Sequence, residues 1–290
     1  MTSCGHDDSL DPSWAWVPPQ TTWVGSDSHY PEEGPVREVS VNGFWMQKHQ
    51  VTNDQFAAFA SETSYVTVAE RPLDPNAYPD APPQNLQPGS MVFRRTEGPV
   101  DLRRMDLWWR WTPGACWNHP RGPRSSLKNR GDHPVVHVGF EDAAAYAEWA
   151  GRELPTEAEW EVAARGGRPH CTYTWGDDPE KPGQRLANFW HGEFPYLPDT
   201  GYGQTAPVGS FQANDYGLFD MAGNVWEWTD STFDGAPAQD GAEAVIAIKG
   251  GSYLCAENYC RRYRASARQP QEAGFATNHI GFRTVKDSAP

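Results

Sequence analysis

The chain has 290 residues and a formal net charge of −14 at pH 7, which argues against nucleic acid and against an anionic membrane as partners, because both attract a basic face. Its 27 glycines and 26 prolines limit regular structure, and its 14 tryptophans supply bulky, flat side chains for a core. We therefore expect an irregular, loop-rich globular protein.

The N-terminus and the cysteines indicate in which cellular compartment the protein is expected. Met1–Ser13 is acidic and lacks the apolar segment of a secretory signal, so we expect a flexible tail. No apolar run is long enough to cross a bilayer. We expect a cytoplasmic protein, in which five cysteines do not form a disulfide scaffold.

The first elements in chain order are two short strands, Val36–Val41 and Phe44–Met46, around a turn at Asn42–Gly43. Residues 70–132 follow as the least regular part, because their prolines exclude long elements. Four tryptophans gather there and would either plug the core or wall a groove. They are Trp108, Trp109, Trp111 and Trp117.

Three helices are expected. Thr52 begins one that runs to about Ser64, with Gln55 completing a capping box and Phe56, Phe59 and Ala60 on the buried face. A second spans Glu141–Ala150. Thr156 caps the third, with Glu159 as its box partner, and Gly166–Gly167 ends it.

The segment His133–Val138 reads as a short buried strand. His133 and His137 share the i, i+4 spacing of a zinc motif, but that spacing brings ligands together only on a helix. On a strand the two would stand about 13 Å apart, too far for one ion. We therefore reject a metal pair there.

Two cysteines follow a glycine turn near the C-terminus. Cys255 and Cys260 stand five positions apart behind Gly250–Gly251–Ser252, and neither a helix nor a strand puts residues i and i+5 on one face, so they can act together only on a bend. Three interpretations remain open: a small disulfide ring worth about 2 kcal/mol, two unrelated thiols, or a reactive dithiol or soft-metal site. Nearby arginines, Arg261, Arg262 and Arg264, would favour thiolates and so the third.

Hard oxygen donors surround a second glycine turn. Asp220, Asn224 and Glu227 lie within Gly217–Trp228 and are of the kind that Ca²⁺ prefers, although the EF-hand order of ligands is absent. Any calcium would also need backbone carbonyl oxygens.

Together these segments resemble the formylglycine-generating enzymes of the sulfatase-modifying factor family. The resemblance extends from Trp14 to Lys286. It rests on His133–Val138, Leu154–Glu161 through Gly167, Gly217–Trp228, Lys249–Arg268 and His279–Arg283. It implies one catalytic domain over residues 14–290, with a mixed α+β fold low in regular structure, the family's variant of the C-type-lectin-like architecture.

The activity that this resemblance implies is oxidation, by O₂, of a cysteine in an unfolded client sulfatase to Cα-formylglycine. The client cysteine lies in a Cys-x-Pro-x-Arg motif, which this chain lacks. Cys255 and Cys260 match the family's active-site pair and would bind Cu(I), a soft ion that two thiolates suit. The client thiolate would join them, and hydrogen abstraction from its Cβ followed by loss of sulfide would leave the aldehyde.

The same resemblance assigns further site residues. Ser252 and Tyr259 match polar residues beside the pair, and Trp226 matches an aromatic wall of the cleft. Without the resemblance, Ser252 reads as a turn residue and Tyr259 as core packing. His279 falls where relatives carry Asn or His near the site and would add a hydrogen bond.

Two structural calcium sites are also implied. Asp220, Gly223, Val225 and Glu227 match the first, with carbonyl oxygens from the first three and the side chain of Glu227. The second is matched by Asn188, Phe189 and Tyr202, but the loop after Pro195 is shorter than expected, so its acidic ligand is missing or replaced by Asp199. Cysteines that form a disulfide in some relatives fall here at Ala265 and Thr284, which agrees with a cytoplasmic protein.

Two alternatives stay open. One is a cofactorless oxygenase that uses Cys255 and Cys260 as a redox dithiol. The other is a lectin-like binding module that kept the fold without the chemistry, although two thiols at this spacing beside Ser252 would have no use in it. For either enzyme we expect a monomer.

Overall fold

The computed structural model describes residues 12–76, 79–80, 82–83, 86–181, 183–234 and 244–286. The tail predicted over residues 1–13 lies outside these ranges, except for Pro12 and Ser13. Within the described ranges, no helix combines the length and the apolar character needed to cross a bilayer.

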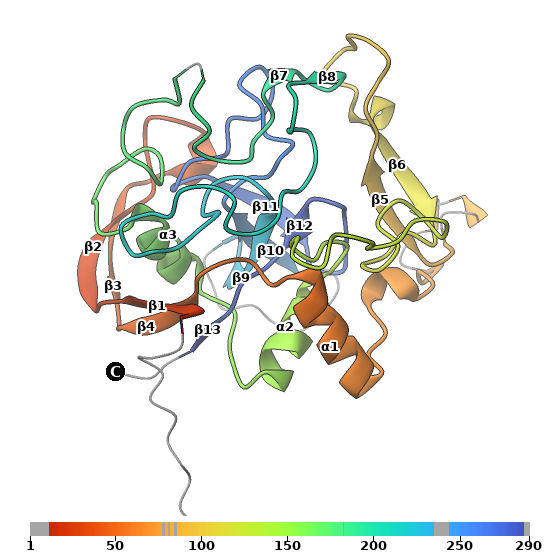
Figure 1. The fold of residues 1–290 in the computed structure, drawn as a ribbon, viewed down its shortest axis with the longest axis horizontal. Helices are drawn as coiled ribbons and strands as arrows, with labels where there is room; N and C mark the ends of the chain where they lie inside the picture. The colour runs from red at the N-terminus through yellow and green to blue at the C-terminus, as the bar shows by residue number, and fades with distance from the viewer. Residues whose placement is uncertain are drawn as a thin grey trace, which may run out of the picture.

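A four-stranded sheet lies at the centre of the molecule (Figure 1). Its strands are β9 (Trp226–Thr232), β10 (Val245–Lys249), β11 (Arg268–Glu272) and β12 (Ile280–Gly281), in the order β11-β10-β9-β12. The strands pair antiparallel except β12, which runs parallel to β9. The cysteine segment joins β10 to β11 and is therefore anchored at both ends in this sheet.

A second sheet brings the two ends of the described chain together. It contains β1 (Trp14–Val17), β4 (Phe44–Gln47) and β13 (Val285–Lys286), in the order β1-β4-β13. Separate two-stranded sheets form from β2 (Gln20–Val24) with β3 (Arg37–Val41), from β5 (Gly89–Phe93) with β6 (Trp109–Pro113), and from β7 (Gly192–Glu193) with β8 (Leu197–Pro198).

The two strands predicted around Asn42–Gly43 are confirmed as β3 and β4, but they do not pair with each other. β3 pairs with β2, and β4 pairs with β1 and β13. The turn packs against Trp16 so closely that a Cβ on Gly43 would come 2.4 Å from the indole ring. Packing on that ring separates the two strands into different sheets.

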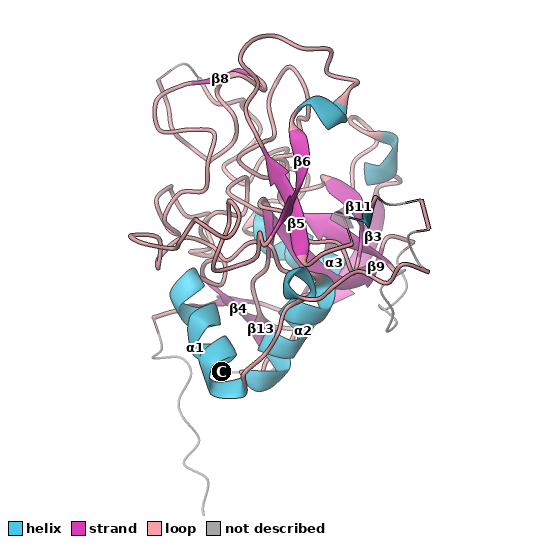
Figure 2. Ribbon diagram, turned by 90° about the vertical axis from the view of Figure 1, so that its right-hand side faces the viewer, coloured by secondary structure: helices cyan, strands magenta, loops and turns pink. Residues whose placement is uncertain are grey.

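The three predicted helices are present as α1 (Asn53–Thr63), α2 (Phe140–Trp149) and α3 (Glu157–Arg165). The capping boxes predicted at Thr52 and Thr156 are formed, and Gly166 ends α3 in the left-handed conformation. α1 and α2 lie side by side at one end of the molecule, while loops fill much of the opposite end (Figure 2). Short 3₁₀ helices cover Pro31–Glu33, Val68–Glu70 and Met105–Leu107.

The strand predicted over His133–Val138 is wrong. The backbone N–H of Val135 donates to Val51 O, whereas that of His137 donates to Thr277 O, so neighbouring bonds go to different segments. His137 also has φ of 61°, outside the range of a strand. The side chains of the two histidines have separate partners too, since His133 contacts Thr205 and His137 contacts Ser90.

Buried ion pairs hold α3 against the central sheet. Lys249 at the end of β10 is fully buried and lies 2.9 Å from the carboxylate of Glu161 on α3. Arg165 makes a second ion pair with that carboxylate, at 2.7 Å. Because Lys249 precedes the glycine turn directly, these contacts also fix where the cysteine segment begins.

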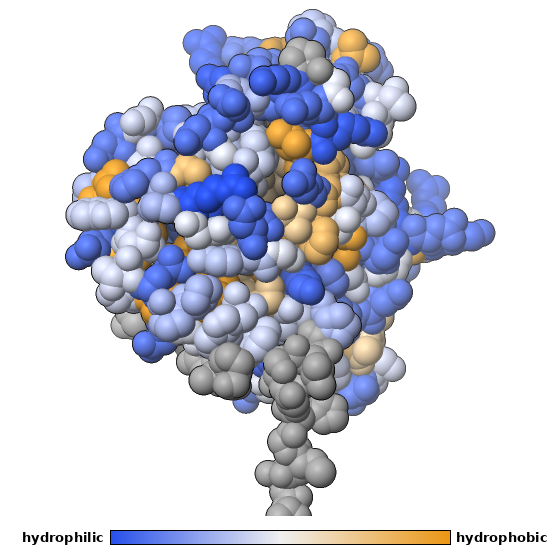
Figure 3. Space-filling model, turned by 60° about the vertical axis from the view of Figure 1, so that its left-hand side comes forward, coloured by the Kyte–Doolittle hydropathy of each residue, from blue (hydrophilic) through white to orange (hydrophobic). Residues whose placement is uncertain are grey.

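The tryptophans divide between core and half-buried positions. Trp108 and Trp117 are buried, while Trp109 and Trp111 on β6 are half-buried. On the face drawn in Figure 3 hydrophilic surface predominates, and hydrophobic surface gathers mainly along a depression.

Candidate active site

The glycine turn after β10 sets up the bend that carries the two cysteines. Gly250 and Gly251 have φ of 91° and 71°, which side chains rarely adopt. A Cβ on Gly251 would also lie 2.4 Å from Arg262 O. The predicted bend is therefore present, because only glycine allows the incoming and outgoing chain to approach so closely.

The bend brings the two sulfurs together. Cys255 Sγ and Cys260 Sγ are 3.3 Å apart, and both cysteines are free, at a separation well beyond the 2.03–2.05 Å of a disulfide bond. Cys255 is 1% exposed, whereas Cys260 is half-buried. Cys255 is thus enclosed, whereas Cys260 is partly exposed.

The two thiols are electrostatically unequal. The hydrogen bond from Cys255 and then the Arg262 guanidinium, whose Nη1 lies 3.7 Å from Cys260 Sγ, together lower the pKa of Cys260 to about 6. Burial, and then the neighbouring Cys260, raise the pKa of Cys255. At neutral pH the pair is a thiolate at Cys260 that accepts a hydrogen bond from the thiol of Cys255.

Arg262 is held by residues that sequence reasoning missed. Its Nη2 lies 2.5 Å from Glu32 Oε1, and its guanidinium stacks 4.0 Å from the centre of the Tyr30 ring. The other two arginines predicted to act on the thiols have different partners: Arg261 pairs with Glu257, and Arg264 with Glu33. Nothing in the local sequence around Tyr30 indicates a contact with a segment about 230 positions away.

Tyr259 lies between aromatic rings beside the pair. Its ring stacks on Phe194 at 4.7 Å and meets Trp108 edge-on at 5.6 Å. Burial raises its pKa, and the two cysteines raise it further. Tyr259 therefore packs in the core and also lies beside the cysteine pair, so the two interpretations of this residue do not exclude each other.

The other predicted site residues lie around the pair at different depths. Ser252 is fully buried, and its Oγ accepts the backbone N–H of Leu254, as a turn residue does. Trp226 is 2% exposed and belongs to the same hydrophobic cluster as Cys255. His279 packs on Trp109 and contacts Thr277 Oγ1, and burial lowers its pKa to about 3, so its imidazole is neutral.

Gln50 occupies the centre of the first predicted calcium site. Its Nε2 lies 3.4 Å from Asp220 O, 3.3 Å from Val225 O and 2.9 Å from Glu227 Oε1. Three of the predicted ligands thus turn oxygens toward one point, which an amide hydrogen-bond donor fills. A cation there requires the Gln50 amide to turn its oxygen inward instead.

The two acidic residues of this site differ. The carboxylate of Glu227 is already neutralised by Arg283, at 2.7 Å, and accepts a further bond from Trp160. The carboxylate of Asp220 accepts a bond from Gly209 N and forms no ion pair with any described residue, and burial raises its pKa to about 6. Asp220 is the carboxylate whose charge a cation would compensate.

The second predicted site contains one unsatisfied oxygen. Asn188 is 1% exposed, and its Oδ1 has no hydrogen-bond partner among the residues that the structure describes. Asn188 also bridges to Gly223, which brings the two predicted sites side by side. Of the other predicted ligands, Phe189 stacks on Tyr263. Tyr202 N donates to Asp199 O, and Asp199 is exposed. The buried Asn188 oxygen suits a hard cation.

The cysteine pair offers two soft ligands. Within the described ranges, no group of three or more His, Cys, Asp or Glu side chains could hold a metal ion. A metal at the pair would therefore have Cys255 and Cys260 as its protein ligands, a donor set that fits Cu(I).

A family model matches nearly the whole chain. The "Sulfatase-modifying factor enzyme 1-like domain" matches residues 7–288. The chain belongs to this family. The predicted membership is thus confirmed, and curated relatives named "Formylglycine-generating enzyme" match most of the chain. The relative from Mycobacterium tuberculosis is 52% identical over 282 residues, which cover 91% of this chain and 94% of the relative. That from Thermomonospora curvata is 43% identical, with 89% and 87% covered.

The family also contains a relative without the activity. "Inactive C-alpha-formylglycine-generating enzyme 2" of Mus musculus is 35% identical over 98% of this chain and 88% of the relative. Among solved structures, PvdO from Pseudomonas aeruginosa has a TM-score of 0.62 at 22% identity, with 94% and 93% covered, and CarF has 0.56 at 21%, with 96% and 98% covered. These structures show the fold alone and confirm the predicted α+β architecture of the family.

Proposed function

We propose that this protein converts the cysteine of a Cys-x-Pro-x-Arg motif in an unfolded sulfatase to Cα-formylglycine, using O₂ and copper. The observation that carries the proposal is the pair of free sulfurs 3.3 Å apart, one enclosed and one half-buried. The names of the relatives support the same reaction. Because one relative of similar length is named inactive, membership of the family does not by itself carry the proposal.

Each cysteine has its own task in this proposal. Cys260 is ionised first and lies on the half-buried side, where a client thiol can approach. Cys255 donates a hydrogen bond to it until both sulfurs are needed as ligands. Bound copper would supply one-electron chemistry with O₂, which side chains cannot supply.

The surrounding residues prepare this site. Arg262 stabilises negative charge on Cys260, and the aromatic rings around Tyr259 exclude water from one side. Ser252 holds the turn that places Cys255, since Ser252 O accepts the Cys255 N–H. Trp226 on β9 packs in the same hydrophobic cluster as Cys255, and its backbone N–H donates to His279 O in the loop before β12.

Calcium is proposed as a structural ion. The converging oxygens around Gln50 support a first site of Asp220, Gly223, Val225 and Glu227, in which the Gln50 amide turns its oxygen inward. The unpartnered Oδ1 of Asn188 supports a second, with Phe189, Tyr202 and Asp199. Neither ion takes part in the oxidation.

The test is mass spectrometry of a motif peptide incubated with the protein and O₂. We expect the cysteine to lose sulfide and become an aldehyde when copper is present, and to stay unchanged without O₂ or with a Cu(I) chelator. A peptide in which alanine replaces the motif proline reports sequence specificity. Full activity in the chelator would favour the cofactorless dithiol, and an unchanged peptide under all conditions would overturn the proposal.

A further inference from the structure

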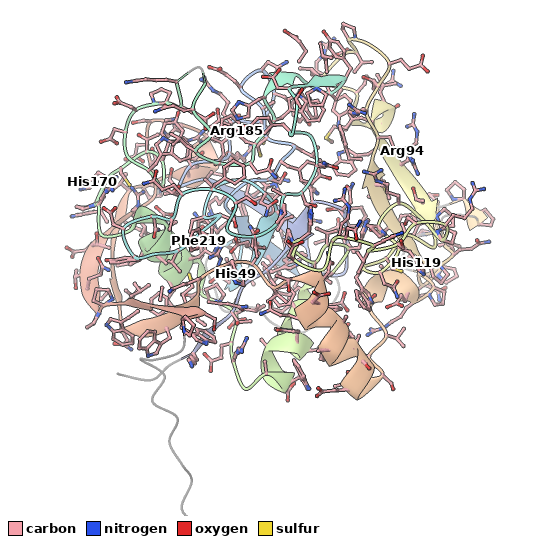
Figure 4. The ribbon with its side chains drawn as sticks, viewed as in Figure 1. His49, Arg94, His119, His170, Arg185 and Phe219 are labelled. Atoms are coloured by element: carbon pink, nitrogen blue, oxygen red, sulfur yellow. The ribbon has the colours of Figure 1, made fainter. Side chains whose placement is uncertain are left out.

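A cleft of about 750 Å³ lies beside the cysteine segment. One side is formed by the chain leaving β5, including Arg94, which Figure 4 labels near the β5–β6 hairpin. Further walls come from some of the residues between positions 120 and 136 and between positions 196 and 205, and Tyr253 also lines the cleft. The cleft has the size of a site for a small molecule or a short peptide segment.

The cleft is cationic in an acidic protein. Arg94, Arg95, Arg121 and Arg130 line it, and no Asp or Glu does, although the whole chain carries a net charge of −14. None of the four forms an ion pair with a described carboxylate, whereas the buried arginines Arg165, Arg264 and Arg283 all do. The positive charge in the cleft is therefore uncompensated within the described part of the chain.

Arg130 shows this lack of compensation most clearly. It is half-buried, and among the described residues its guanidinium donates only to neutral oxygens, at 3.0 Å to Gln204 and 3.5 Å to Thr205. Burial, and then the charge of Arg121, lower its pKa. Two like charges face one cavity whose walls exclude part of the solvent, which concentrates positive potential there.

The cleft is close to the reacting sulfurs. Tyr253 stands two residues before Cys255, and two residues of chain span at most about 7 Å. Phe93, which also lines the cleft, packs on Trp190, whose N–H donates to Cys255 O. One extended polypeptide can therefore reach both the cleft and the cysteine pair.

We propose that this cleft is an anion-binding subsite that takes carboxylate side chains of the client polypeptide flanking its Cys-x-Pro-x-Arg motif. The inference rests on the proposed function for the identity of the client. The subsite would not take the arginine of the motif, because its lining is cationic. The field of the whole protein, with its net charge of −14, favours basic flanks, so a preference for acidic flanks can come only from a local site.

The experiment uses fluorescent motif peptides in which serine replaces the cysteine, so that binding is measured without turnover. The peptides carry glutamates before the motif, glutamates after it, glutamines, or lysines at the same places. We expect one glutamate arrangement to bind about three- to tenfold more tightly than the glutamine peptide at low salt, with the difference shrinking as salt rises. Equal binding, or a preference for lysine, overturns the inference.

The variant Arg94→Gln/Arg95→Gln/Arg121→Gln removes three exposed cleft arginines without breaking any ion pair. It should abolish the preference for glutamate while leaving the dissociation constant of the glutamine peptide unchanged. Arg124→Gln is the matched control, since Arg124 is exposed on the same segment but does not line the cleft. If Arg124→Gln weakened the preference equally, a general surface-charge effect would replace the subsite.

Two further arms separate the possible failures. Turnover of the glutamine-flanked cysteine peptide tests the proposed oxidation independently of the cleft. A failure of the oxidation can therefore be distinguished from a failure of the anion-binding subsite. Sodium sulfate is compared with sodium chloride at equal ionic strength. Selective loss of the glutamate preference in sulfate supports an anion subsite. Sulfate binding without any glutamate preference overturns the assignment to the client and leaves a site for small oxyanions only.

Discussion

Arg262 lies with one guanidinium nitrogen 3.7 Å from Cys260 Sγ, and it adds to the hydrogen bond from Cys255, which is the larger cause of the lowered pKa of Cys260. Glu32 holds the other end of the same guanidinium at 2.5 Å. The reactivity of the site thus depends on a carboxylate from the N-terminal part of the chain, far from the cysteine segment in sequence.

The pH dependence of thiol reactivity follows from the contacts of Cys260 with Cys255 and Arg262. Because the pKa of Cys260 is lowered to about 6, its rate of alkylation should rise as pH increases through about 6, where the thiol becomes the reactive thiolate. Alkylation of Cys260 can be followed by peptide mapping from pH 5 to 9. A midpoint near the ordinary cysteine pKa of about 8.5 would contradict the assignment.

Two substitutions should move that midpoint upward. Cys255→Ala removes the hydrogen bond that lowers the Cys260 pKa most, and Arg262→Gln removes the neighbouring positive charge. We expect the larger shift from Cys255→Ala. Arg261→Gln serves as control, because Arg261 pairs with Glu257 on the surface and should leave the midpoint unchanged.

Substitution of either sulfur should abolish the reaction and preserve the fold. Cys255→Ser and Cys260→Ser each remove a soft ligand, and the resulting hydroxyl is a poor ligand for Cu(I). We expect no detectable formylglycine by mass spectrometry and an unfolding temperature close to that of the wild type. Cys171→Ser should keep activity, because the buried thiol of Cys171 contacts Arg165 O and not the cysteine pair. Turnover in either active-site variant would exclude the two-sulfur site.

The stability of the sheet should depend on Lys249. Replacing it by alanine leaves Glu161 with one of its two cationic partners inside the core. Losing a partner of a buried ion pair costs about 3–5 kcal/mol of unfolding free energy, which urea denaturation can measure. Arg71→Ala, which breaks an exposed pair with Glu141, should cost less than about 1 kcal/mol. Equal losses would show that Lys249 is not an anchor of the cysteine segment.

Calcium should stabilise the protein more as its concentration rises. Ca²⁺ added to chelator-treated protein is expected to raise the unfolding temperature, since binding to the folded state alone adds RT ln(1 + [Ca²⁺]/Kd). Gln50→Glu places an anionic oxygen where the Nε2 of Gln50 now lies and should increase the effect. Gln184→Glu, at an exposed position, is the control. If calcium shifted the unfolding temperature of neither the wild type nor Gln50→Glu, the proposed first calcium site would be wrong.

Much of the local structure could be predicted from the sequence. Thr52 with Gln55 and Thr156 with Glu159 mark helix starts, because a capping box is satisfied by residues three positions apart. Gly250 and Gly251 before Cys255 indicate the bend, because the conformation they adopt excludes a side chain. These features depend on neighbours in the chain, so the residues themselves determine them.

Contacts between distant segments could not be predicted in this way. The segment His133–Val138 has the composition of a strand, yet its backbone bonds to Val51 and Thr277 instead of to a neighbouring strand. The hairpin predicted around Gly43 is likewise divided between two sheets by Trp16.

The sequence by itself determined the family, the helix starts and the bend with its two cysteines. Only the tertiary structure decided which thiol is ionised, that Gln50 faces the predicted calcium ligands, and that four arginines share one cleft. The physical reason is that charge and hydrogen-bond energies depend on distances between side chains, and here those side chains come from segments that only folding brings together.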